Sequence, residues 1–374
     1  MFVSLGMRFL ANIEALNAVE SVGNVTKHRR APIVVLDEKT GKYTIRYVPS
    51  ISGESLGHAY QSNVVEFATE VYNGNPPVCK WCSRGEFFKS MSLKFTHEEA
   101  KKVQEERKST ADLESVKHEF EKAVIRSCLV EDIGGFLLAE EDFPVKRTSV
   151  FFTGYVVPTL DSLEATVIDT QFHARHAPVM AGKKEEKEAT GKKEEDEVAG
   201  EEKQKKQKKE VAAQMIYYVE VASAVYGMRI DIDLDAIGRT KLVLVEDAVD
   251  AEERKKRVLC ALGGLALTAL GRFGAKRSRF NPISEVKSIL VTVSDVYSFS
   301  VTPPHTRDYI AFTLKRANAA LGFIQEAGLK GEIKLLAYDG ETGVRLEGVS
   351  YFDTPEDLFR ALINYVKENY LKQG

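Results

Sequence analysis

The chain has 374 residues, with 52 Lys and Arg against 55 Asp and Glu, so its formal net charge is only −3. This length allows a sizeable buried core, and the near-neutral charge means that any site for a polyanion must be local. The four cysteines are too few for a disulfide framework. The N-terminus lacks a basic leader, and the longest apolar run, residues 258–270, is shorter than the roughly 20 residues that span a bilayer. We therefore expect a soluble cytoplasmic protein with no membrane contact.

Strands and helices alternate along the first half of the chain. The elements expected there are a strand over 2–12, a hairpin over 31–49, a helix from Ser52 to before Gly74, polar helices over 97–129 and a strand over 147–158. The hairpin follows from the turn residues "DEKTGK" between two β-rich runs. Glu54 falls in the first turn of the helix, where an acid is favourable.

The second half has the same mixed character. It is expected to hold a β-rich stretch over 213–238, a helix over 248–271, a strand over 287–300, a helix over 306–327, a hairpin over 331–352 and a last helix capped by Thr354. Helices and hairpins in this order favour an α+β sheet with helices on one face over a doubly wound parallel sheet.

One segment, residues 183–210, differs in composition from the rest. It holds ten Lys and ten acidic residues, and Val198 is its one large aliphatic residue. It cannot bury enough apolar surface to offset the entropy of ordering. We expect a solvated, disordered insertion loop there.

Cys79 and Cys82 form a single Cys-x-x-Cys motif, "CKWC". Zinc prefers four ligands, and no second cysteine pair follows. The only complement that the sequence suggests is His173 and His176, which are far away in the chain. We therefore expect two thiols in a loop, no metal site and no cofactor.

The sequence shows no catalytic motif. "GRFGAK" at 271–276 lacks the spacing of a phosphate-binding loop, and neither a dinucleotide fingerprint nor a nucleophile elbow is present. We therefore expect no catalytic residues and a protein that is not an enzyme.

Three basic segments stand out against the near-zero net charge. They are Lys27, His28, Arg29 and Arg30 in "VTKHRRAP"; His173, Arg175 and His176 in "FHARH"; and Arg272, Lys276, Arg277 and Arg279 in "GRFGAKRSRF". In the last segment Phe273 and Phe280 alternate with the cations. Arginine binds phosphates bidentately and aromatic rings stack on unpaired bases. Each segment follows an expected strand, so we expect the three loops to converge on one RNA or single-stranded DNA site.

Four stretches carry a resemblance to a known family. They are "VSLGMRFLANIEALNAVESVGNVTKHRRAPIV", "SISGESLGHAYQ", "TQFHARHAP" and "YYVEVASAVYGMRIDIDL". Together they resemble the large backbone subunit of type I-A CRISPR Cascade effector complexes, in the DevR-like branch of the RAMP superfamily. The resemblance covers most of the chain outside 183–210.

The resemblance implies an α+β fold with an RRM-like, ferredoxin-type palm and large insertions, including a β-hairpin thumb. Residues 1–146 would form the N-terminal part of the palm with a helical insertion. Residues 147–225 would form the thumb, which contains the charged loop 183–210. Residues 226–374 would complete the palm and carry the glycine-rich basic loop.

The resemblance also implies RNA contacts by position. "SGESLGHA" matches the turn at the start of the helix that holds the RNA backbone, so Ser52, Ser55 and His58 would donate hydrogen bonds. Sister subtypes have cations where this chain has Gly57 and His58. Asn17 and Asn24 fall near the end of the first strand, where the family makes polar RNA contacts.

The implied function is that of a CRISPR RNA-binding backbone subunit in an antiviral surveillance complex. Copies would assemble head-to-tail along the guide RNA, present its bases to target DNA, and contact a smaller RAMP subunit, a small subunit and a helicase or nuclease. One alternative is a RAMP endoribonuclease that processes precursor RNA, with His28, His173 or His176 as acid or base. Another is a transcriptional autoregulator, although no helix-turn-helix motif is apparent.

Overall fold

A mixed sheet forms the centre of the protein. The structure is a computed structural model that describes residues 1–14, 18–22, 25–37, 39–106, 112–176, 214–273 and 283–371. The strands of the central sheet are β1 (Phe2–Glu14), β2 (Ala18–Val22), β3 (Val25–His28), β8 (Phe151–Thr153), β9 (Val157–Pro158), β10 (Val167–His176), β11 (Gln214–Asp233), β12 (Ile283–Ser294), β13 (Ile333–Asp339) and β14 (Ser350–Phe352). Among the described residues its order is β14-β13-β12-β1-β11-β3-β2, and β8, β9 and β10 also pair with β11.

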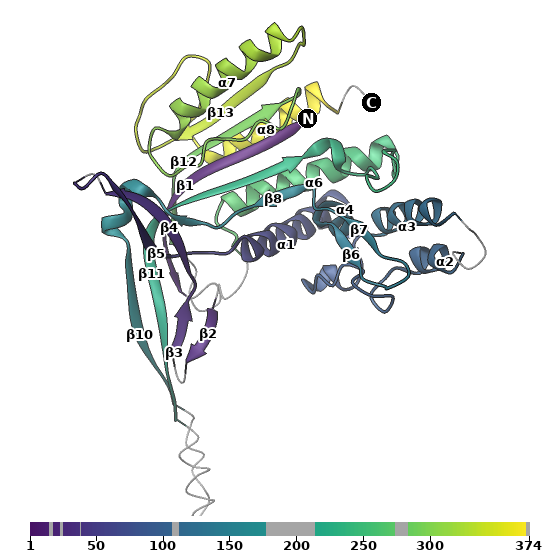
Figure 1. Ribbon diagram of the computed structural model, residues 1–374, viewed down its shortest axis with the longest axis horizontal. Coiled ribbons are helices and arrows are strands. Elements are labelled where there is room, and N and C mark those ends of the chain that lie inside the picture. The colour runs from purple at the N-terminus through teal and green to yellow at the C-terminus, as the bar shows by residue number, and fades with distance from the viewer. Residues whose placement is uncertain are drawn as a thin grey trace, which may run out of the picture.

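Helices and two small hairpins surround this sheet (Figure 1). The helices are α1 (Gly53–Val71), α2 (Glu98–Glu106), α3 (Leu113–Ser127), α4 (Leu129–Gly134), α6 (Ala251–Ala269), α7 (Tyr309–Glu326) and α8 (Pro355–Asn369), with short 3-10 turns η1 (Cys82–Arg84), η3 (Leu160–Ala165) and η4 (Leu234–Ala236). The hairpins pair β4 (Arg30–Asp37) with β5 (Lys42–Pro49), and β6 (Phe136–Leu138) with β7 (Val145–Arg147).

Strand β1 lies at the centre of the core, with antiparallel partners β11 and β12 on its two sides. Because strand side chains alternate, Leu5, Met7 and Phe9 share one face and pack in the core cluster that includes α1, α6 and α8. The other face carries Gly6, where an added Cβ would lie 2.6 Å from a methyl of Val301. A second cluster, which includes α7, covers that side around β12 and β13.

Helices α1 and α6 cross at close range because α6 has two consecutive glycines. A Cβ on Gly264 would lie 3.0 Å from the backbone nitrogen of Val64, and one on Gly263 would enter the ring of Phe67. The Tyr60 hydroxyl donates to the carbonyl of Ala261 across the same interface, at 3.1 Å. The packing of α6 thus fixes the position of α1 on the sheet.

A long ribbon extends away from this body (Figure 1). β10 and the first half of β11 pair antiparallel from Val167↔Ser223 to His176↔Gln214. On its other edge β11 pairs in parallel with β3, at Tyr218↔Val25 and Val219↔Thr26. We call β10, β11, β3 and β2 together the blade.

A buried charge network fixes the short helix α4. Asp132 accepts hydrogen bonds from Arg147 of β7 at 2.7 Å and from Arg257 of α6 at 3.0 Å. Both arginine side chains are 1% exposed and the Asp132 side chain is 0% exposed. Arg147 also pairs with Glu121 of α3, whose carboxylate accepts the N–H of Lys241. The network therefore joins α3, α4, α6 and β7.

Most of the expected elements are confirmed, and the mixed α+β class with them. The expectation of helices on one face of the sheet is wrong, because α7 packs on the face opposite α1, α6 and α8. The hairpin predicted over 31–49, the helix that begins after Ser52 and the Thr354 cap all occur. The hairpin predicted over 331–352 is wrong. β13 and β14 pair in parallel, so the segment between them crosses over instead of turning back.

Within the part of the chain that the structure describes, no helix has the length and apolar composition needed to cross a membrane.

We expect Asp132→Asn to lower the free energy of unfolding by about 3–5 kcal/mol, because it leaves two buried guanidinium groups without their shared carboxylate. Urea denaturation followed by circular dichroism measures this change. The control is Glu164→Gln, which removes the partner of Arg46 in a pair whose side chains are 49% and 86% exposed. It should cost less than about 1 kcal/mol. Equal losses for the two variants would contradict the role of the network.

Candidate nucleic-acid interface

The start of α1 follows from a local sequence signal. Ser52 is the N-cap, and its hydroxyl accepts the N–H of Ser55 at 3.2 Å. The first-turn N–H groups of a helix have no partner within the helix and carry a partial positive charge, which favours an anion at this end. The acid Glu54 lies in the same turn.

The segment around β8 packs closely on this helix start. The Thr153 hydroxyl donates to the carbonyl of Gly53 at 2.9 Å, and a Cβ on Gly53 would lie 3.1 Å from the Thr153 carbonyl. A Cβ on Gly57 would lie 3.3 Å from the ring of Phe151. Gly57 is buried by this packing, so a cation at this position would lose the close contact between helix and strand.

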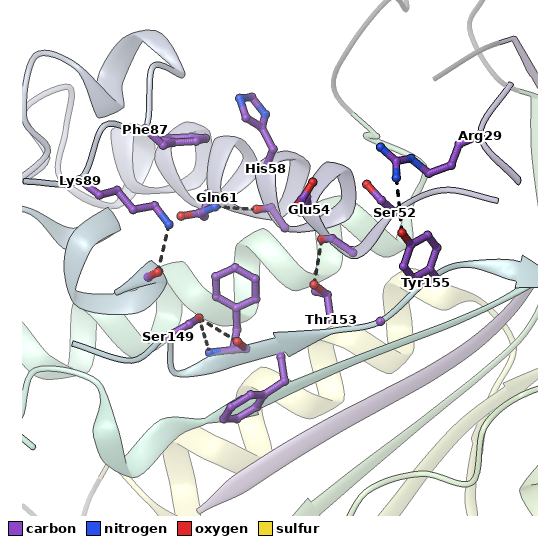
Figure 2. A pocket seen from close by; sticks show the side chains of 16 residues that line it. Arg29, Ser52, Glu54, His58, Gln61, Phe87, Lys89, Ser149, Thr153 and Tyr155 are labelled. Carbon is purple, nitrogen blue, oxygen red and sulfur yellow. Dashed lines mark hydrogen bonds between the residues drawn. The ribbon is translucent and has the colours of Figure 1, made fainter. Parts of the chain in front are cut away.

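A groove of about 740 Å³ runs along the start of α1, and we call it the α1 groove. It is lined by Arg29, Ser52, Gly53, Glu54, Gly57, His58, Gln61, Phe87, Lys89, Gly134, Ser149, Phe151, Phe152, Thr153, Gly154 and Tyr155. Figure 2 shows Arg29 and Tyr155 at one end and Lys89 at the other. Five separate parts of the chain therefore meet at this groove.

At the first end, Arg29 lies in the short connection between β3 and β4. Its guanidinium donates to the hydroxyl of Tyr155 at 3.4 Å. Tyr155 is 52% exposed, and Phe152 on β8 is 48% exposed. Phe151 packs against α1, so the side chain of the next residue, Phe152, points to the opposite face of β8. A cation and an exposed aromatic ring, here Arg29 and Tyr155, are groups that hold a single-stranded nucleic acid by phosphate contact and base stacking.

At the second end of the groove, the segment after α1 provides the residues that contact His58, together with the cation Lys89. The His58 ring lies 4.8 Å from that of Phe87, and its Nε2 is 3.1 Å from the carbonyl of Gly85. Lys89 donates to the carbonyl of Gly134 at 3.0 Å and has a left-handed backbone with φ of 50°. Burial lowers the pKa of Lys89. His58 thus lines the groove near the helix start, as predicted, and Lys89, which the sequence did not single out, lines it as well.

The basic segment 27–30 forms parts of two strands rather than a turn, and its residues differ in environment. His28 does not fit the predicted RNA contact: it is 3% exposed, its N–H donates to Glu220 and its Nδ1 faces the Arg29 carbonyl. Burial lowers the pKa of His28, so its imidazole stays neutral near pH 7. Arg30 pairs with Glu220 at 3.2 Å, whereas Lys27 is exposed on β3.

The blade brings "FHARH" toward the same strand. His173, Arg175 and His176 lie on β10, opposite Tyr217, Met215 and Gln214 of β11. The next residue of β11, Tyr218, pairs with Val25 of β3. Two of the three predicted basic segments therefore flank one stretch of β11, although the side chains of 173–176 lie outside the described part.

The third basic segment begins after α6, where Arg272 contacts a part of α1 outside the α1 groove. Arg272 forms an ion pair with Glu66, and its carbonyl accepts from Asn63 at 2.9 Å. Neither Asn63 nor Glu66 lines the α1 groove. Phe273 is 6% exposed and its ring lies 5.4 Å from that of Phe9, so the prediction that it stacks on bases is wrong.

Several predicted residues have no described environment. Asn17, Asn24, Lys276, Arg277 and Arg279, together with the charged segment 183–210, lie outside the described residues. Ser55 is partly buried and does not line the groove.

Sequence reasoning missed Lys89 and Tyr155. Tyr155 stood in a stretch predicted as a plain strand, and only its exposure beside Arg29 marks it. The run of aromatic residues in "FFTGY" was the available signal.

The sequence model of one family, described as "CRISPR-associated negative auto-regulator DevR/Csa2", matches residues 5–313. The chain belongs to this DevR/Csa2 family. The family assignment suggested by the sequence motifs is confirmed.

Relatives within the family match nearly the whole chain. A Saccharolobus solfataricus protein named "CRISPR-associated aCascade subunit Cas7/Csa2 2" is 36% identical over 362 residues, covering 95% of this chain and 98% of the relative. A second protein of that organism, "CRISPR-associated protein Cas7/Csa2 1", is 34% identical and covers 82% of this chain and 83% of the relative. A more distant structural similarity is to a chain of a "CRISPR RNA-guided surveillance complex, pre-nicking", with a TM-score of 0.47, 12% identity, and coverage of 98% of this chain and 99% of that chain.

Proposed function

We propose that this protein is a backbone subunit of a CRISPR surveillance complex and holds guide RNA along the α1 groove and the base of the blade. Family membership supports the first part, since one relative is named as a Cascade subunit. The convergence of Arg29, Lys89, Tyr155 and the start of α1 supports the second.

The groups in the groove suit an RNA backbone rather than particular bases. Arg29 and Lys89 are cations that attract any phosphate, and the N–H groups at the start of α1 add a favourable field. The exposed ring of Tyr155 presents a face on which any base stacks. Sequence recognition is then left to pairing between guide and target DNA.

We infer that the protein binds without cleaving. General acid–base cleavage needs a base positioned near a 2′-hydroxyl. The His28 imidazole is buried, and the His58 Nε2 contacts a backbone carbonyl. His28 lacks the exposure that such a base requires, and the exposed His58 has its Nε2 beside a backbone carbonyl.

We also infer that the body is an RRM-like palm with the blade as its thumb. The placement of β1 between β11 and β12, with α1 and α6 in the core on one face, is what supports this. The extended β10–β11 ribbon has the form of a thumb (Figure 1).

Self-assembly along the guide would use the outer face of the β4–β5 hairpin. Cross-strand pairs put its exposed apolar side chains on one face, and these are Val34 (63%), Leu36 (49%), Tyr43 (75%), Ile45 (66%) and Tyr47 (70%). Apolar patches of this kind mark contact surfaces. A head-to-tail contact between this face and a different surface of the next copy generates an open helical filament.

The RNA contact is tested with Lys27→Ala/Arg29→Ala. We expect weaker binding to single-stranded RNA of any sequence, and a plot of log K against log salt concentration that is shallower by about 1 to 2, because fewer counterions are released. Fluorescence anisotropy at several salt concentrations measures both quantities. Arg360→Ala/Lys367→Ala removes the same charge from exposed positions on α8 and is the control. Identical behaviour of the two double variants would place the RNA elsewhere.

The absence of cleavage is tested with labelled repeat RNA incubated without metal ions. We expect protection of the RNA and no new fragments. Metal-independent fragments that disappear in His28→Ala, His173→Ala or His176→Ala would instead support the endoribonuclease. Preferential binding to duplex promoter DNA over RNA would support the transcriptional autoregulator.

The assembly contact is tested with Tyr47→Asp. We expect RNA-bound oligomers to become shorter, as measured by mass photometry, while the monomer stays folded, because the charge falls on an exposed position. Phe323→Asp, at a side chain on α7 that is also 70% exposed, is the matched control. Equal shortening in both variants would contradict the assignment to the hairpin.

A further inference from the structure

Three of the four cysteines meet outside the α1 groove. Cys79 and Cys82 lie in the segment that follows α1, and Cys128 is the N-cap residue of α4. Glu131 lies in the first turn of that helix. The three sulfur atoms and one Glu131 carboxylate oxygen are all within 4.8 Å of one another.

The spacing of these four atoms matches a tetrahedral metal site. Zinc–sulfur bonds of about 2.3 Å place the sulfurs of a tetrahedron about 3.8 Å apart, and carboxylate oxygen is also a zinc ligand. The N–H of Cys82 donates to the Cys79 sulfur at 3.4 Å, which orients that sulfur and favours its thiolate form.

The Glu131 carboxylate is held in place by a partner on each of its two oxygens. Ser90 donates to Glu131 Oε2 at 2.6 Å, and His97 Nε2 lies 2.7 Å from Oε1. Cys82, Cys128 and Glu131 are each at most 1% exposed. Burying several acidic groups together is costly unless a positive charge compensates them. Partnering by Ser90 and His97 is the arrangement found around metal ligands.

We propose that Cys79, Cys82, Cys128 and Glu131 bind one structural zinc ion. Three thiol ligands favour a thiophilic metal, whereas a disulfide would use two of them and leave the third. Because the protein supplies all four ligands, the site is closed and structural rather than catalytic. His97 positions Glu131 and is not itself a ligand.

The ion would connect the segment after α1 to α4. The two parts also share a small apolar cluster, in which Val130 and Phe87 accompany the cysteines. Phe87 and Lys89 of that segment form one end of the α1 groove, beside His58 (Figure 2). The zinc ion would therefore stabilise that wall, but the metal site is independent of whether the groove binds RNA.

The test uses the full chain, purified without chelators. We expect about one zinc per chain by elemental analysis. After exchange with Co²⁺, we expect thiolate-to-cobalt charge-transfer absorption together with the visible bands of tetrahedral cobalt. Both measurements use the wild-type protein and so do not depend on the folding of a variant. Substoichiometric zinc with no charge-transfer absorption would overturn the proposal, as would a Cys79–Cys82 disulfide found by mass spectrometry.

Variants then assign the ligands. Cys82→Ser and Cys128→Ser should lose the metal, whereas Cys260→Ser should keep it, because Cys260 is buried in α6 away from the cluster. His97→Ala should retain stoichiometric zinc with weaker affinity. Equal metal loss in Cys260→Ser, or full retention in Cys128→Ser, would overturn the ligand set.

Discussion

The geometry of the α1 groove depends on the ion pairs that the buried Asp132 carboxylate forms with Arg147 and Arg257. These two arginines, from β7 and α6, fix the carboxylate, and with it the helix α4. That short helix begins after Cys128 and places Glu131 beside the three cysteines. It ends at Gly134, whose carbonyl accepts a hydrogen bond from Lys89. One electrostatic network in the core therefore determines where one wall of the α1 groove lies. Such a network adds little net stability, but it specifies one arrangement of the helices it joins.

Ion pairing within the fold also explains how a chain with net charge −3 presents a local cationic site. Glu220, on β11, accepts the His28 N–H and pairs with Arg30. These contacts hold the β3–β4 connection and direct Arg29 toward Tyr155 at the groove. Local field, not total charge, decides where a polyanion is attracted. His28 and Arg30 thus hold the protein backbone in place through Glu220, whereas Arg29 faces the groove.

Short-range signals in the sequence predicted the elements well. The Ser52 cap and the β4–β5 turn are decided by residues within a few positions of one another, and both occur. Contacts between distant segments were not predictable in this way. His28 is buried because β11 supplies Glu220, and the Cys-x-x-Cys pair gains Cys128 only when α4 packs beside it. Periodicity gives no information on such pairings, nor on the parallel register of β13 and β14.

Photo-crosslinking of guide RNA to the purified protein, with the crosslinked peptides identified by mass spectrometry, tests most directly whether the α1 groove holds RNA. We expect crosslinks at Tyr155, and at Phe87 on the opposite end of the groove, because these rings lie where bases would stack. Crosslinks confined to α7 and α8, with none in the segments that line the groove, would contradict this placement.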